Sequence, residues 1–126
     1  MIQKIDHLVI TTAQPEKLLP FYEALGFTAK EDGGRYALFA GDFKINVHIK
    51  GRELSPHAAH IVPGSADLCF EVTGPLANFK ETLLAKGLSI ELGIVDRNGV
   101  RGKMQSIYLR DPDCNLIEFC CYAPQA

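Results

Sequence analysis

The chain has 126 residues, a formal net charge of −2 and 47% hydrophobic residues. This length suits one compact domain that can bury a sizeable core. The weak negative charge argues against sequence-independent binding of nucleic acid. No apolar run approaches the roughly 18 residues that a membrane-spanning helix needs, so no membrane partner is expected.

The four cysteines show no CxxC spacing, and the N-terminal residues lack the layout of a secretion signal. Three of them lie within apolar, strand-like runs, where small hydrophobic side chains belong. We therefore expect free thiols in a reducing compartment, the cytoplasm.

The chain begins with a predicted strand and a predicted helix. Residues 5–12, IDHLVITT, alternate between two faces as a strand does, and His7 lies on one of them. Residues 15–25 place leucine and aromatic side chains at helical spacing, with a proline at the start and Gly26 at the end. Pro20 conflicts with this helix, because proline removes a hydrogen bond, and it is expected to kink the helix.

Three strands complete the first half. Residues 27–31 form a short strand that ends at the Asp-Gly-Gly turn of residues 32–34. Residues 35–40 and 44–49 follow as a second hairpin. The order of elements in this half is therefore β-α-β-β-β.

The second half repeats this order after a linker, residues 51–64. The linker holds two prolines, two glycines and a histidine pair that we interpret as solvent-exposed. The next expected elements are a strand over residues 65–72, a helix over 75–86, a short strand over 88–92 and a long polar loop over 93–103. Basic residues in that loop could meet an anionic ligand, although a solvated loop is the simpler interpretation.

The last expected elements lie in the sequence SIYLRDPDCNLIEF, residues 106–119. It predicts two short strands joined by an Asp-Pro-Asp turn. Glu118 lies in the middle of the second strand, where a half-buried carboxylate is costly without a partner. Either Glu118 faces solvent or it has a partner, which could be a metal. Residues 122–126 are expected to fray.

The two halves resemble each other in sequence, which indicates a duplicated module. We interpret residues 1–126 as one domain with an internal repeat, residues 1–50 and 65–122. Aligning the halves places one polar residue in each of four apolar strands. The first strand of one half matches the first strand of the other, and the last strand of one half matches the last strand of the other. The matched pairs are His7 with Asp67 and His48 with Glu118.

All four matched residues are of metal-ligand types. Two imidazoles and one carboxylate can bind a divalent transition metal and leave positions open for substrate oxygens. If the halves pair about a pseudo-twofold axis, these side chains converge on one cleft. The sequence therefore predicts a metal site of His7, His48 and Glu118, with Asp67 either a fourth ligand or a residue that orients one. Ligand types leave the choice among Fe, Mn, Ni and Zn open.

Further residues are predicted to line this cleft. Strand alternation places Ser106, Tyr108 and Arg110 on one face, where they could bind a polar or anionic substrate edge. Tyr36 and Asn46 would line the cleft from the other half. For each a plain structural role is an equal alternative. The residue that moves a proton is not evident, and Glu118 or Asp67 is the best candidate.

The chain resembles the vicinal oxygen chelate superfamily, also called the glyoxalase/bleomycin resistance/dioxygenase family. The resemblance covers nearly the whole chain, in IDHLVI, PEKLLPFYEALGF, INVHI and SIYLRDPDCNLIEF. Within it the chain is similar to short single-domain proteins of the glyoxalase domain-containing protein five type, on residues 58–67 and 106–118. The resemblance implies an α+β fold in which two βαβββ modules pair into a curved mixed sheet around a cleft, with the helices on the convex side. It also implies a divalent metal, a substrate that chelates it through adjacent oxygens, and a homodimer.

Two positions depart from the patterns of related enzymes. His48 stands where glyoxalase I enzymes carry a carboxylate, and Asp67 stands where many members carry histidine. The first hypothesis is a metal-dependent lyase, isomerase or thiol-transferase-like enzyme acting on a small oxygen-rich metabolite. The alternative is a metal-free protein that binds or sequesters a small molecule, as bleomycin-resistance proteins do.

Overall fold

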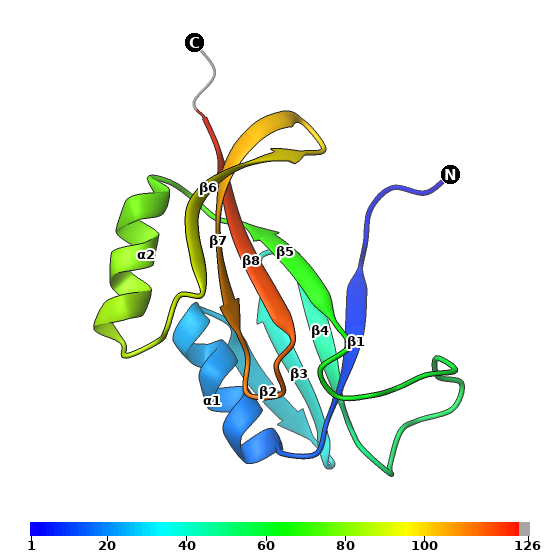
Figure 1. Cartoon of the computed structure of the whole chain (residues 1–126). Coiled ribbons are helices and arrows are strands. Elements are labelled where there is room, and N and C mark those ends of the chain that lie inside the picture. Colours follow the sequence, from blue (N-terminus) through cyan, green and yellow to red (C-terminus); the bar gives the residue numbers. More distant parts are fainter. Residues whose placement is uncertain (124–126) are drawn as a thin grey trace. The chain divides into compact units, whose positions relative to one another are not determined.

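The computed structural model describes residues 1–123, which form two βαβββ modules (Figure 1). The first module contains β1 (His7–Thr12), α1 (Pro15–Leu25), β2 (Thr28–Asp32), β3 (Arg35–Ala40) and β4 (Phe43–Ile49). The second contains β5 (Asp67–Glu71), α2 (Leu76–Ala85), β6 (Leu92–Gly99), β7 (Gly102–Arg110) and β8 (Leu116–Tyr122). The predicted α+β class with two such modules is confirmed.

The chain divides into two compact units that follow these modules. The first unit comprises Met1–Ala66 with Pro112–Cys114, and the second comprises Asp67–Asp111 with the residues from Asn115 onward. The turn between β7 and β8 groups with the first unit because the Gln14 amide donates to the Pro112 carbonyl oxygen and to Asp113 Oδ1, at 3.1 and 2.8 Å. The predicted linker, residues 51–64, contains neither helix nor strand.

The first sheet has the strand order β1-β4-β3-β2, with β1 and β4 parallel and the other pairs antiparallel. Its buried face carries Leu38 opposite Ile45, and both side chains are fully buried. Leu18 and Tyr22 of α1 are also fully buried and complete this core. The helix runs through Pro20 over its whole predicted span, because packing of its apolar side favours the helix over the lost hydrogen bond.

The second sheet repeats this plan in the order β5-β8-β7-β6, again with one parallel pair. Leu109 lies opposite Ile117, and Ile107 lies opposite Phe119, all of them buried. The predicted loop over residues 93–103 is wrong, because β6 and β7 form a hairpin there. The polar residues Asp96, Arg97 and Asn98 are tolerated in β6 because it is an edge strand, whose side chains need not enter the core.

The remaining observations concern the chain end and the membrane. Tyr122 is the last residue of β8. The predicted fraying is therefore wrong for Tyr122, and residues 124–126 of that prediction lie outside the described residues. No helix in the described part of the chain is long and apolar enough to cross a membrane.

Candidate metal and substrate site

The first module carries its predicted ligands on one face of β1 and β4. Register pairs His7 with Lys44, Val9 with Asn46, and Thr11 with His48, so all of these residues share a face, which we call the first site face. The His7 side chain is 45% exposed, and its Nδ1 lies 2.8 Å from Asp6 Oδ1. This hydrogen bond holds the pKa of Asp6 below its usual value. Because Nδ1 is occupied, Nε2 of His7 is the nitrogen left to bind a metal.

His48 is half-buried, and its Nδ1 atom is buried without a hydrogen-bond partner. Buried polar atoms of this kind call for an explanation, and a bound ion is one. The spacing is less favourable, since the residue opposite His7 is Lys44. His48 lies four residues further along β4, roughly 13 Å at the usual strand rise.

The strand registers correct the predicted match between the modules. Asn46 lies opposite Val9 on β1, and Glu118 lies opposite Cys69 on β5. If His7 matches Asp67, the residue that matches Glu118 is therefore Asn46. The alignment that placed His48 there was wrong by two residues, a shift that leaves the alternation of faces unchanged.

Tyr36 is the second correction. It lies opposite Val47, whereas Ala37 lies opposite Asn46. Neighbouring residues along a strand point to opposite faces, so Tyr36 shares the buried face of the sheet. The prediction that Tyr36 and Asn46 line the same cleft is therefore wrong for Tyr36, while Asn46 lies on the first site face.

The second module brings its predicted residues together on one face, which we call the second site face. Tyr108 lies opposite Glu118, and Arg110 and Asp67 both lie opposite Leu116. Ser106 is on the same face, two residues before Tyr108 on β7. The prediction that Ser106, Tyr108 and Arg110 share a face is confirmed.

Glu118 is held by a hydrogen-bond network on this face. The Ser106 hydroxyl donates to Glu118 Oε2 at 2.6 Å, and Ser106 is fully buried. Tyr108 lies opposite Glu118 on the neighbouring strand, close enough for the two side chains to interact. Burial raises the pKa of Tyr108, and Glu118 adds to this rise, while Arg97 opposes it. Ser106 is therefore placed to orient Glu118, and its burial keeps it from the solvent-facing side where a substrate would bind.

Two arginines on this face have different surroundings. Arg110, predicted from the sequence, bonds Glu91 through both Nε and a terminal nitrogen, at 3.0 and 3.3 Å. Arg97 lies on β6, and its Nε donates to the Tyr108 hydroxyl at 3.0 Å. Sequence reasoning treated Arg97 as part of a loop. Gly99 and Gly102 flank the two-residue turn of this hairpin, and these glycines are the signal that could have placed Arg97 on a strand.

Two thiols lie beside Glu118. Cys69 is opposite Glu118 on β5, and Cys120 follows two residues later on β8. Burial raises the pKa of both thiols. All four cysteines are free, as predicted. The two thiols therefore behave as protonated, weakly polar neighbours of the carboxylate.

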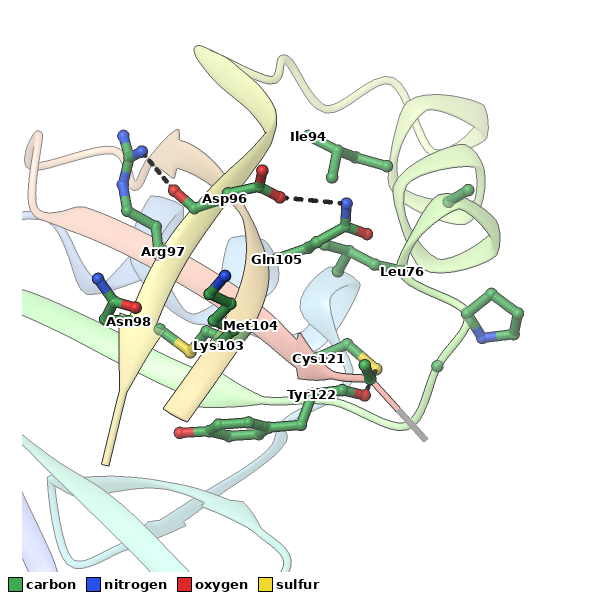
Figure 2. A pocket seen from close by; sticks show the side chains of 14 residues that line it. Leu76, Ile94, Asp96, Arg97, Asn98, Lys103, Met104, Gln105, Cys121 and Tyr122 are labelled. Carbon is green, nitrogen blue, oxygen red and sulfur yellow. Dashed lines mark hydrogen bonds between the residues drawn. The ribbon is translucent and has the colours of Figure 1, made fainter. Parts of the chain in front are cut away.

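A separate cavity of about 1020 Å³ lies in the second module, between the start of α2, the strands β6 and β7, and the end of β8 (Figure 2). Its walls include Leu76, Ile94, Met104 and Cys121. None of the residues predicted for the metal and substrate cleft lines it, whereas Arg97 and Lys103 of the β6–β7 hairpin do. Within residues 1–123, no three His, Cys, Asp or Glu side chains gather in a way that could hold a metal.

The fold agrees with the comparisons to known proteins. The chain belongs to the Glyoxalase/Bleomycin resistance protein/Dioxygenase superfamily, whose family model matches residues 4–119. It is 44% identical to "Virulence protein STM3117" of Salmonella typhimurium over 124 residues, which are 97% of this chain and 86% of that protein. It is 43% identical to "Glyoxalase domain-containing protein RDO1" of Mycosarcoma maydis over 122 residues, 96% of this chain and 69% of that protein.

Solved structures support the same assignment. The crystal structure of Virulence protein STM3117 superposes with a TM-score of 0.93 and covers 98% of this chain and 99% of its own. An integron cassette protein of V. cholerae, 42% identical, superposes with a TM-score of 0.92 over 98% of each chain. The family predicted from the sequence motifs is therefore confirmed.

Proposed function

We propose that this protein is a divalent-metal-dependent enzyme acting on a small, oxygen-rich metabolite that binds the metal through adjacent oxygens. The observation that carries this proposal is the fixed carboxylate of Glu118, held by Ser106 and facing Tyr108 on the second site face. A carboxylate whose orientation is fixed by neighbouring side chains can bind a cation without reorganising.

His7, Glu118 and one residue of β4 are the proposed ligands. The residue types suit Fe, Mn, Ni or Zn. For β4, the orphaned Nδ1 atom supports His48, which the sequence predicted. The strand register supports Asn46, because it occupies the position that matches Glu118. Asp67 starts β5 on the same face as Glu118 and is the proposed fourth ligand or orienting residue.

A metal bound there would act as a Lewis acid toward substrate oxygens. The protein's own residues would position and protonate the substrate. Ser106 fixes the orientation of Glu118, and Tyr108 offers a hydroxyl at the edge of the site. Glu118 or Asp67 would accept a proton. Proton movement next to a polarised oxygen suits a lyase, an isomerase or a thiol transferase.

Metal analysis of protein purified without chelator tests this function. We expect about one transition metal per active site, lost in His7→Ala and in Glu118→Ala. Comparing His48→Ala with Asn46→Ala identifies the ligand on β4, because only removal of the true ligand depletes the metal. His60→Ala in the linker is the control and should keep the metal. Metal-free parent protein that still binds a small molecule would instead support the sequestering alternative.

A homodimer is part of the same proposal, because members of this superfamily commonly build their sites from paired modules. Light scattering coupled to gel filtration measures the mass in solution. A mass of twice 13.9 kDa is expected. A strictly monomeric mass would remove the dimer from the proposal and leave the ligand assignment to the metal analysis.

A further inference from the structure

Arg97 is a cation on the second site face for which the described residues supply no carboxylate partner. It lies on β6, and alternation places it on the face opposite Asp96 (Figure 2). Its Nε donates to the Tyr108 hydroxyl, and the guanidinium carbon lies 5.4 Å from the centre of the Tyr108 ring. Its Nη1 donates to the Asp96 backbone carbonyl at 2.9 Å. These contacts fix the plane of the guanidinium.

The other two arginines of the β6–β7 hairpin region differ from Arg97 because each pairs with a carboxylate. Arg101 pairs with Glu71 at 2.8 Å, and Arg110 pairs with Glu91 at 3.0 Å. Among the described residues, Arg97 forms no ion pair with a carboxylate. A guanidinium has five N–H donors, and two are engaged here, so three remain on an oriented and exposed charge.

We propose that Arg97 binds an anionic group of the substrate, of the carboxylate class. This inference rests on the proposed function, since it uses the same face. A fixed, unpaired guanidinium matches the geometry of a carboxylate and costs little to order on binding. The remaining donors of Arg97 would meet the carboxylate, and the hydroxyl of Tyr108 would hold the arginine in place.

The position of Arg97 defines the size of this substrate. Tyr108 links the two regions, because its hydroxyl accepts a hydrogen bond from Arg97 and the residue itself lies opposite Glu118 on the neighbouring strand. A ligand that meets both regions therefore has two adjacent oxygens at one end and a carboxylate a few atoms away. Small hydroxy or oxo acids with a further carboxylate have this form.

Two matched probes test the carboxylate site. Acetohydroxamate is a neutral chelator with two adjacent oxygens, and the monohydroxamate of succinic acid is the same chelator carrying a carboxylate. With Ni(II)-loaded protein, calorimetry should show that the carboxylate probe binds about tenfold more tightly, the effect of one charge-assisted contact. Arg97→Gln should remove this advantage and leave the affinity for acetohydroxamate unchanged. Arg101→Gln is the control, because its charge already has a partner, and it should keep the advantage.

The outcomes separate this inference from the proposed function. If the carboxylate probe binds more tightly than acetohydroxamate by the same factor in the parent protein and in Arg97→Gln, the carboxylate site is overturned, whereas the proposed metal site is unaffected. If the parent takes up no Ni(II), the proposed function fails, and a second measurement decides on the carboxylate site. Metal-free protein labelled with ¹⁵N is then titrated with acetate. A saturating shift of the Arg97 Nε–H signal, identified by its loss in Arg97→Gln, supports the inference, and an unmoved signal overturns it.

Discussion

The two modules share one backbone plan and differ in chemistry at matched positions. Asn46 is flanked by Val9 and Ala37, whereas its counterpart Glu118 is flanked by Cys69 and Tyr108. The second module therefore places a thiol and a phenol beside an acidic group, which also accepts a hydrogen bond from Ser106. The first module surrounds a neutral amide with apolar groups and carries imidazoles elsewhere on the same face.

The buried faces show the opposite trend. Leu38 pairs with Ile45 in the first sheet, and Leu109 pairs with Ile117 in the second, with all four side chains within 1% of full burial. The core positions thus kept their residue type through the duplication, while the site faces diverged. Packing constrains the core of each module in the same way, because a cavity is costly in either one. Function acts only on the face that meets ligand.

The largest expected effect tests whether the two modules depend equally on their buried cores. Ile45→Ala and Ile117→Ala remove matched, fully buried side chains, one in each module. Each should lower the free energy of unfolding by about 3 kcal/mol. Urea denaturation measures both.

The exposed helix residue Leu84 provides the control for these core variants. Leu84→Ala should change the stability by less than about 0.5 kcal/mol. A large loss for one isoleucine with almost none for the other would show that the modules do not depend equally on their cores.

The sequence predicted the elements well where a local signal exists. The span of α1 matches its prediction at both ends, because helical spacing and Gly26 mark the boundaries. The shared face of Ser106 and Tyr108 was also predicted, since alternation along a strand is a local property.

The predictions that were wrong depended on pairing between distant segments or on an ambiguous local pattern. A shift of two residues preserves alternation, so sequence alone could not choose between Asn46 and His48 as the match of Glu118. The alignment of β3 with β7 was wrong by one residue, which put Tyr36 on the wrong face of its strand. The cause is that the turns following these two strands differ in length. Arg97 was assigned to a loop instead of a strand, because this edge strand lacks the apolar alternation that marks a strand.

The next prediction sharpens the contrast between the site faces. Ser106→Ala removes the hydroxyl that donates to Glu118 at 2.6 Å within a buried position. We expect the affinity for the metal to fall roughly tenfold or more, because residues that orient a ligand carry such effects. We also expect a stability loss of about 1–3 kcal/mol, since a charged acceptor loses its donor. Metal competition assays and urea denaturation measure the two quantities.

Ser89→Ala in the same module is the matched control, because Ser89 is exposed. It should leave both quantities within error of the parent protein. If Ser106→Ala behaves like Ser89→Ala in metal affinity, the hydrogen bond to Glu118 has no role in holding the ion.

The smallest expected effect concerns the ionisation of Tyr108 in metal-free protein. Its pKa is raised above 10.0 by burial, then lowered by the hydrogen bond from Arg97 and raised by Glu118. Arg97→Gln should therefore raise this pKa further, and Glu118→Gln should lower it. The folded state holds the phenol proton more tightly than the unfolded chain does. The contribution of Tyr108 to the free energy of unfolding should therefore be fully present below pH 10.0 and be lost as the pH rises through the folded pKa. NMR titration of ¹³C-labelled tyrosine, with Tyr108→Phe to assign the signal, measures the shifts. Opposite shifts of the Tyr108 pKa in the two variants are expected for a phenol held between a cation and a carboxylate. Shifts of the same sign would contradict this arrangement. The first module has no such phenol, because Ala37 occupies the position that matches Tyr108.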